Sequence, residues 1–386
     1  MAVTPVEAAR KLAPRAAELA GEGERARRLP AELSAEIAAA GLYRLCVPER
    51  LGGAQAPPAE LLAAVEALAG GDGAAGWCVA VCATAGMLAA YLEPETAAEI
   101  YGDPLAVAGG VFAPSGRAVA AGDELEIRGR WRFCSNIHNC DWLMGGCIVE
   151  DGDQPRRTAA GGPEIRLVLM PAAELELIDT WSVSGLRATG SHDIAADRVI
   201  APARRSASLI SDRPLDPGAL YAFPPFGLLA ASIAAVALGI ARAAIDDLRG
   251  LAGAKTPTLS TRKLAERPAT QTAVARAEAQ VRAARALLFD AVDRAWIRAQ
   301  AQDEGRLPGE LRAGLRLAAT HAVEAATEAV DAMQRLAGGS AIYESSPLER
   351  RFRDIHVATQ HMLIGPATWE LGGRALLGLE LDDSQL

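Results

Sequence analysis

The chain contains six cysteines, and no two of them form a CxxC pair. In a chain of 386 residues with no secretion signal, such thiols are expected to stay reduced, as they do in cytosolic proteins. Cys78 and Cys82 lie one helical turn apart inside an apolar run, where core packing is the expected role and metal ligation the weaker alternative. We therefore predict no metal site.

The sequence also lacks the short motifs of several large enzyme classes. It contains no P-loop, no GxGxxG after a strand, no GxSxG elbow and no zinc pattern. A hydrolase triad of Ser346, Asp354 and His361 can be picked out, but any chain of this length allows such a choice. These absences argue against NTPases, dinucleotide-binding enzymes and α/β-hydrolases.

Positive charge and long apolar runs are scarce as well. The formal net charge of −9 leaves no basic face for a phosphate backbone, so we expect no nucleic-acid partner. Residues Met1 to Gly21 form a charged amphipathic pattern without the apolar core of a signal peptide. The longest apolar run, Leu228 to Ala241, is shorter than a bilayer span and ends in Arg242. We expect a cytoplasmic protein without a membrane segment.

Periodicity divides the chain into three regions. Apolar residues recur at helical spacing at about 6–21, 30–40, 58–68 and 73–92, and again at 226–249, 266–302, 311–337 and 347–377. Between Leu105 and Pro202 the pattern becomes short and alternating, with turn residues between segments, which predicts antiparallel strands. The segregation of helices and strands indicates an α+β fold with a helical domain (1–104), a barrel-like β-domain (105–205) and a helical bundle (206–386).

The stretch from Gln334 to His361 is dense in functional residue types. Ser346 followed by Pro347 predicts a helix start, and Glu349 completes a capping-box spacing. On one continuous helix Asp354 and His361 would share a face, and His356 would diverge from His361 by about 140°. That divergence argues against a two-histidine metal face and leaves open which histidine faces a pocket.

Two segments of the β-region carry chemistry of their own. GRWRFCSNIHNCDWLMGG gathers aromatic rings and a hydroxyl, which suits a flat heteroaromatic cofactor, although an ordinary hairpin is the simpler interpretation of the spacing. GLRATGSHD offers Arg187, Thr189 and Ser191 in a turn suited to an anion, with a plain β-turn as the alternative.

The order of the motifs resembles the acyl-CoA dehydrogenase superfamily over nearly the whole chain. VPERLGG, GGVFAPSG, WRFCSN, SGLRATGSHDI, MQRLAGGSAIY and SPLERRFRDI follow one another as similar segments do in that family. The resemblance implies a fold with an N-terminal helical domain, a middle antiparallel β-domain and a C-terminal four-helix bundle that builds a homotetramer. It implies flavin contacts from Phe112, Phe133, Ser135, Arg187 and Ser191, and from Gln334, Gly338 and Gly339 to a neighbouring subunit's flavin.

One departure from the dehydrogenases bears directly on function. They carry a catalytic carboxylate shortly after the Arg-Asp pair, and here Met362 stands in that register with His361 beside it. FAPSG, WxFxS before CDW, DTWxVxGLRxTGS and RDxHxxxxH resemble instead the flavin-dependent monooxygenase branch of the fold. The segment from Asn136 to Asn139 departs from that branch's phenol hydroxylases, which more often have GxDH there.

The resemblance implies an oxygenase component that receives reduced FMN or FAD from a separate NAD(P)H-dependent flavin reductase. Reduced flavin and O₂ would form a C4a-hydroperoxide that hydroxylates a small aromatic, phenolic or polycyclic substrate. Ser135 would hold the proton at flavin N5, and His361 would deprotonate a phenol or steer the distal oxygen. His138, Trp142 and Met362 would line the substrate site. The alternatives are a divergent FAD-dependent acyl-CoA dehydrogenase or oxidase, an amine N-oxygenase, and a scaffold without flavin.

Overall fold

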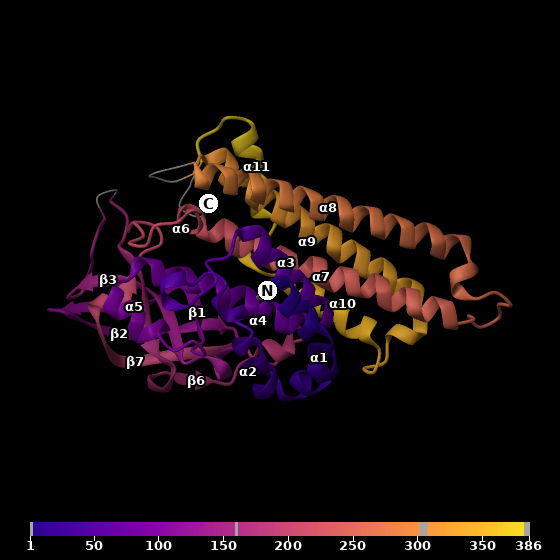
Figure 1. Cartoon of the computed structure of the whole chain (residues 1–386), viewed down its shortest axis with the longest axis horizontal. Helices are drawn as coiled ribbons and strands as arrows, with labels where there is room; N and C mark the ends of the chain where they lie inside the picture. The colour runs from indigo at the N-terminus through magenta and orange to yellow at the C-terminus, as the bar shows by residue number, and fades with distance from the viewer. Residues whose placement is uncertain (1–2, 159–160, 302–306, 382–386) are drawn as a thin grey trace.

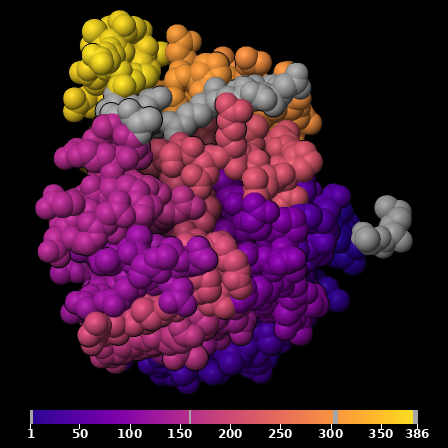
Figure 2. Space-filling model, turned by 90° about the vertical axis from the view of Figure 1, so that its left-hand side faces the viewer, coloured from indigo at the N-terminus to yellow at the C-terminus, as the bar shows by residue number. Residues whose placement is uncertain are grey.

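The computed structural model describes residues 3–158, 161–301 and 307–381. It consists of an N-terminal group of helices, a twisted sheet and a long C-terminal helical domain (Figure 1). The end-on view in Figure 2 has the magenta strands next to the indigo N-terminal helices, with the orange and yellow C-terminal helices above. The predicted α+β class and order of regions are confirmed.

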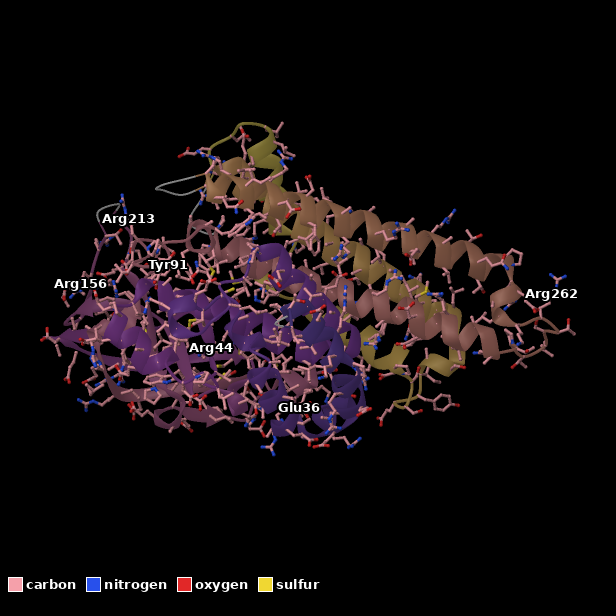
Figure 3. The ribbon with its side chains drawn as sticks, viewed as in Figure 1. Glu36, Arg44, Tyr91, Arg156, Arg213 and Arg262 are labelled. Atoms are coloured by element: carbon pink, nitrogen blue, oxygen red, sulfur yellow. The ribbon has the colours of Figure 1, made fainter. Side chains whose placement is uncertain are left out.

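The N-terminal region is helical, as the 3.6-residue period predicts. Its helices are α1 (Pro5–Ala26), α2 (Ala31–Ala39), α3 (Pro58–Gly71), α4 (Gly73–Ala85) and α5 (Pro94–Tyr101), with 3₁₀ turns η1 (Leu42–Arg44), η2 (Glu49–Leu51) and η3 (Gly86–Tyr91). The stretch expected as one helix at 73–92 therefore changes to a 3₁₀ turn at Gly86. Arg44, labelled in Figure 3, is buried and donates to the carbonyls of Leu51, Tyr101 and Asp103, which ties the turns of this region together.

The middle region forms one eight-stranded sheet in the order β6-β7-β2-β1-β3-β5-β8, with β4 paired to β3. The strands are β1 (Ala108–Ala121), β2 (Glu124–Cys134), β3 (Trp142–Asp151), β4 (Gln154–Pro155), β5 (Ile165–Pro171), β6 (Glu176–Ile178), β7 (His192–Pro202) and β8 (Ser206–Ala207), with 3₁₀ turns η4 (Ile137–Asn139), η5 (Ala172–Glu174), η6 (Arg187–Thr189) and η7 (Ala203–Arg205). The pairing is antiparallel except between β1 and β3, which run parallel, so the prediction of a purely antiparallel region is wrong at this one pair.

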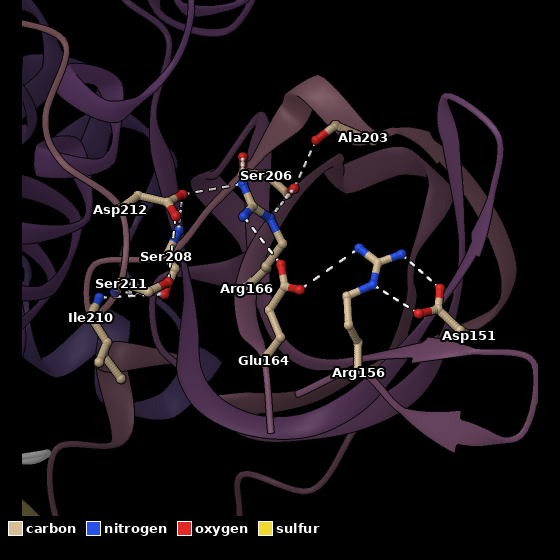
Figure 4. A network of polar contacts seen from close by, with 10 residues as sticks. All are labelled: Asp151, Arg156, Glu164, Arg166, Ala203, Ser206, Ser208, Ile210, Ser211 and Asp212. Carbon is tan, nitrogen blue, oxygen red and sulfur yellow. Dashed lines mark hydrogen bonds and ion pairs between the residues drawn. The ribbon is translucent and has the colours of Figure 1, made fainter. Parts of the chain in front are cut away.

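A polar network joins β3, β5, β8 and the segment that follows β8 (Figure 4). Arg166 on β5 contacts Glu164 at 3.4 Å and Asp212 at 3.2 Å, and Arg156 contacts Asp151 at 2.7 Å. Arg166 Nε also donates to Ser206 Oγ at 2.8 Å. These contacts fasten the sheet edge to the segment that leads into the C-terminal helices.

The C-terminal region contains the longest helices. They are α6 (Ala219–Ala222), α7 (Pro225–Ala254), α8 (Pro268–Gln300), α9 (Gly309–Ala337), α10 (Pro347–Ala358) and α11 (Ala367–Leu376), with 3₁₀ turns η8 (Leu264–Glu266), η9 (Gly338–Ala341) and η10 (Met362–Ile364). The expected end of α8 at Gln302 lies outside the described residues.

The single helix predicted at 347–377 is wrong. α10 ends at Ala358, and the chain continues through η10 to α11. Pro366 stands directly before α11, where its missing N–H is tolerated, and it disfavours helix at Gly365, so one continuous helix through this segment is excluded. The capping box is also wrong. The Ser346 side chain caps nothing, and Glu349 binds Arg353 instead. His361 therefore does not share a helical face with Asp354.

Two stretches, Gly73–Tyr91 and Pro225–Ala254, are long and apolar enough to cross a membrane by length and composition. In each, 94% of the apolar window is buried inside the protein, which is typical of core helices. The apolar run judged too short to span is thus part of a 30-residue helix. Its burial, rather than its length, explains its composition.

Candidate active site

The candidate site is organised by Trp77 on α4, a helix that packs against α7, β1, η6 and α10. Trp77 Nε1 donates to Ser135 Oγ at 3.0 Å, and its ring meets the His361 ring edge-on with centroids 5.8 Å apart. Trp77 thereby contacts both Ser135 and His361, the two residues predicted from the sequence to be catalytic. The sequence analysis missed Trp77, although a tryptophan inside an apolar helix signals that its N–H has a buried partner.

Ser135 follows the end of β2 and is buried with two further hydroxyls. Its Oγ lies 2.7 Å from Ser191 Oγ, which in turn lies 2.6 Å from Thr189 Oγ1. Thr189 Oγ1 donates to the carbonyl of Leu186 at 2.9 Å. The predicted anion turn and the predicted aromatic segment therefore meet through a continuous chain of hydroxyls.

Phe133 presents a flat, accessible ring two residues before Ser135. Its φ of 65° falls where the β2–β7 register shifts between Trp131 and Cys134. Such an irregularity re-aims a side chain, and the Phe133 ring is 68% exposed. Its centroid lies 6.2 Å from that of Trp181 in an edge-on pair, so the exposed ring has a fixed support.

These groups fit a flavin. The Nε atom of Arg187 is buried and has no hydrogen-bond partner in the described part of the chain, which suits an anionic group such as a flavin phosphate. Phe133 offers a stacking face and Ser135 a polar atom beside it. Phe112, the remaining flavin residue expected from the sheet, lies in the β1 irregularity after Val111 and meets Phe226 of α7 with centroids 6.1 Å apart.

His361 caps η10, and its Nδ1 accepts the N–H of Leu363 at 3.2 Å. Burial, and to a smaller extent the Arg316 guanidinium, lower the pKa of His361 to about 4. Arg316 of α9 donates from Nε to the Leu363 carbonyl at 2.9 Å, which fixes the same turn from the other side. The imidazole is therefore neutral near pH 7.

Asp354 on α10 supports the turn that carries Thr189 and Ser191. Its Oδ1 accepts the N–H of Leu186 at 2.6 Å, which holds the turn that carries the hydroxyl chain. Burial and the neighbouring Asp72 carboxylate raise the pKa of Asp354 to about 7, against the lowering effects of the Leu186 N–H bond and of Arg350 and Arg353. Asp72 is the buried N-cap of α4 and accepts from the N–H of Ala75 at 3.0 Å.

The expected substrate residues do not gather around His361. His138 meets His192 with ring centroids 5.3 Å apart, and Trp142 lies under the Arg205 guanidinium at 5.0 Å. Met362, next to His361 in the chain, is exposed. His192 is buried and accepts from the N–H groups of Thr180 and Trp181, because the turn after β6 folds over it.

Other expected flavin residues lie far from Ser135 in the same protomer. Gln334, Gly338 and Gly339 are at the far end of α9, where Lys255 binds the Ala337 carbonyl at 2.7 Å. From Arg316, which is beside His361, to Gly338 the helix rises about 33 Å. His356, the second candidate histidine, binds Asp331 at 2.9 Å. The structure thus brings together His361, Ser135 and Ser191, and Phe133 lies two residues before Ser135.

Comparison with known proteins identifies the family of this chain. The family description "Acyl-CoA dehydrogenase, N-terminal domain" matches residues 6–100, and "Acyl-CoA dehydrogenase, C-terminal domain" matches residues 231–366. An indole-3-acetate monooxygenase of Pseudomonas putida is 34% identical, over 93% of this chain and 90% of that protein. The chain belongs to the acyl-CoA dehydrogenase superfamily. Within it, this flavoprotein is the oxygenase component of a two-component flavin-dependent monooxygenase, as the resemblance implied.

Further proteins are similar to this oxygenase component over nearly its whole length. The oxygenase component of the FADH₂-dependent resorcinol hydroxylase of a Rhizobium species is 28% identical, over 94% of this chain and 91% of that protein. The structure of 3-HSA hydroxylase from Rhodococcus sp. RHA1 matches with a TM-score of 0.90 at 24% identity, over 99% and 98% of the two chains. XiaF from Streptomyces, solved with FADH₂ and glycerol, matches with a TM-score of 0.87 at 25% identity, over 98% and 96%. The named activities of the indole-3-acetate monooxygenase and the resorcinol hydroxylase favour a monooxygenase over a dehydrogenase, an oxidase or a scaffold without flavin.

The raised pKa of Asp354 predicts how the stability of this oxygenase component depends on pH. Between about pH 4 and pH 7 the folded protein holds a proton on Asp354 that the unfolded chain has lost. That contribution to stability is complete below pH 4 and is lost as pH rises to 7, by at most about 4 kcal/mol. Asp354→Asn keeps the acceptor for Leu186, so its stability relative to wild type should increase from pH 5 to pH 7.

Thermal melts of wild type and Asp354→Asn at pH 5, 6, 7 and 8 measure this difference. Asp153→Asn, an exposed site in the turn between β3 and β4, is the matched control, and its difference from wild type should not vary with pH. A pH-independent difference for Asp354→Asn as well would contradict the raised pKa.

Proposed function

We propose that this oxygenase component oxygenates a small, electron-rich aromatic substrate that lies between His361 and the flavin. The observation that carries the proposal is the contact between the neutral His361 ring and Trp77, whose N–H binds Ser135. The named activities of the relatives support an aromatic substrate, since indole-3-acetate and resorcinol both carry a planar ring. A phenol is one member of this class and an indole another.

His361 acts in this proposal as a hydrogen-bond donor. Its Nδ1 accepts the N–H of Leu363, so the proton of the neutral ring resides on Nε2. No described residue is bonded to Nε2, which leaves that N–H for an oxygen atom of the substrate or of the oxidant. A donor of this kind fits the steering role expected from the sequence better than the abstraction of a phenolic proton. It therefore suits an indole as well as a phenol.

The flavin residues have separate tasks. Phe133 supplies a stacking face, Arg187 an anion contact and Ser135 a polar contact at the reactive edge of the ring. When bound, the reduced flavin would activate O₂, and one atom of that O₂ would be transferred to the substrate. The buried, mostly apolar surroundings of Trp77 keep water from that edge. The reduced flavin comes from a separate reductase.

We also propose that two protomers complete each flavin site, as part of a homotetramer. The support is the separation of about 33 Å along α9 between the Arg316 region and the exposed glycines Gly338 and Gly339. These glycines cannot meet a flavin beside Ser135 in their own protomer. We therefore propose that Gly338, Gly339 and Gln334 contact the flavin bound beside Ser135 of a neighbouring protomer.

Rapid mixing of the anaerobic protein–reduced flavin complex with oxygenated buffer tests the function. We expect a transient near-ultraviolet absorbance distinct from both reduced and oxidised flavin, followed by product when indole-3-acetate or resorcinol is present. The same experiment is run with FMN and with FAD. Direct reoxidation without a transient, together with bleaching of bound FAD by an acyl-CoA, would instead identify a dehydrogenase.

A further inference from the structure

The hydrogen bonds among the hydroxyl groups of Thr189, Ser191 and Ser135 can run in only one direction, because one end of the series is a carbonyl that only accepts. A hydroxyl has one proton and two lone pairs, a backbone carbonyl only accepts, and an indole N–H only donates. Thr189 donates its proton to the Leu186 carbonyl at 2.9 Å, so at the 2.6 Å contact Ser191 must donate to Thr189. Ser191 has then used its proton, and at the 2.7 Å contact Ser135 must donate to Ser191.

The contact at the Ser135 end of this series of hydroxyls agrees with the same direction. Trp77 Nε1–H donates to Ser135 Oγ at 3.0 Å, so one lone pair of Ser135 is occupied and its proton is turned towards Ser191. The one remaining position on Ser135 Oγ is a lone pair. All three hydroxyls are buried, with exposures of 1% for Thr189, 3% for Ser191 and 5% for Ser135, so bulk water does not reorient them.

An oxygen that offers only a lone pair distinguishes the two redox states of a flavin. N5 of the reduced ring carries a proton and donates, whereas N5 of the oxidised ring carries a lone pair and accepts. We propose that the Thr189–Ser191–Ser135 chain makes this site selective for reduced over oxidised flavin by presenting an acceptor at N5. The inference rests on the proposed position of flavin N5 beside Ser135.

The selectivity has a definite physical origin. For Ser135 to donate to oxidised flavin, every hydroxyl in the chain must reverse, and Thr189 must give up its bond to the Leu186 carbonyl. One neutral hydrogen bond inside a protein corresponds to a difference of roughly tenfold in an equilibrium constant. Thr189 is thus a positioning residue, since it acts on the flavin only through Ser191 and Ser135.

Thr189→Val tests this directly because valine has the shape of threonine without the hydroxyl. In the variant, Ser191 loses its acceptor and turns its proton to Ser135, which frees the Ser135 proton for oxidised N5. We expect the ratio of oxidised to reduced Kd to fall by about tenfold. Thr189→Ser keeps the hydroxyl and should stay within about twofold of wild type. Ser191→Ala removes the acceptor by another route and should behave like Thr189→Val.

The measurement is fluorescence titration of the full-length protein with FMN and with FAD, each oxidised and, under argon, dithionite-reduced. The midpoint potential of the bound flavin reports the same ratio independently, because affinity and potential are linked. Unchanged ratios in both Thr189→Val and Ser191→Ala, with both redox forms still bound, would overturn the hydroxyl chain as the cause. Failure of the wild type to bind either form would overturn the proposed function, and the inference with it.

Discussion

His361→Ala is expected to lower the yield of hydroxylated product per O₂ consumed by at least about tenfold, with flavin binding unchanged. His361 contacts Trp77 and presents its unbonded Nε2–H, so its removal takes away a positioned donor from the reacting oxygen. Loss of one such group typically costs a factor of 10² to 10³ in rate, part of which is lost here as uncoupled peroxide. The measurement is O₂ consumption against product with a preferred aromatic substrate.

Two companion variants make this result specific. His356→Ala removes the other histidine of the segment, which binds Asp331 away from Trp77, and should leave coupling at the wild-type level. His361→Gln replaces the ring with an amide that can still donate, and should retain part of the coupling if donation is the role. Equal loss in His361→Gln and His361→Ala would instead favour His361 as the base, and full coupling in His361→Ala would exclude it from catalysis.

The pH dependence of coupling adds an independent check on His361. Its pKa of about 4, set by burial and then by Arg316, keeps the ring neutral throughout the range from pH 6 to pH 9. Coupling is therefore expected to be flat over that range as far as His361 is concerned. A rise with an apparent pKa between 6 and 7 that disappears in His361→Gln would contradict the lowered pKa.

Arg353→Met is expected to lower the free energy of unfolding by roughly 2 to 4 kcal/mol. The Arg353 side chain is 20% exposed and forms ion pairs with Glu24 and Glu349, both of which are similarly shielded. It also donates to the Ser184 carbonyl at 2.7 Å. Without the guanidinium, the two carboxylates are left facing each other in a partly buried position. Differential scanning calorimetry should record a lower midpoint of unfolding by several degrees.

A matched control separates this effect from the loss of an arginine as such. Arg335 on α9 is 74% exposed and lies 3.9 Å from Asp331, one helical turn away. Arg335→Met should change the midpoint by less than a degree or two, because exposed pairs contribute about 0 to 1 kcal/mol. If Arg353→Met and Arg335→Met had the same midpoint of unfolding, the contacts of Arg353 with α1 and with the turn before η6 would not stabilise the fold.

The site was partly predictable because local chemistry marks some of its members. Ser135 and His361 stand in motifs whose residue types are legible without coordinates, and the structure brings both to Trp77. The prediction that Asp354 and His361 share a helical face is wrong, because the helix ends at Ala358 and Asp354 accepts the N–H of Leu186 instead. Face arguments on a helix hold only as far as the helix runs.

The sequence by itself determined the α+β class, the order of the three regions and the monooxygenase branch, since periodicity and motif order are local properties of the chain. Only the tertiary structure decided how the candidate residues act together. Trp77 and Ser135 are 58 positions apart, and Leu186 and Asp354 are 168 apart. No local period records such pairs, because the partner of a buried donor is set by which helices and strands pack together, and packing is a property of the whole fold.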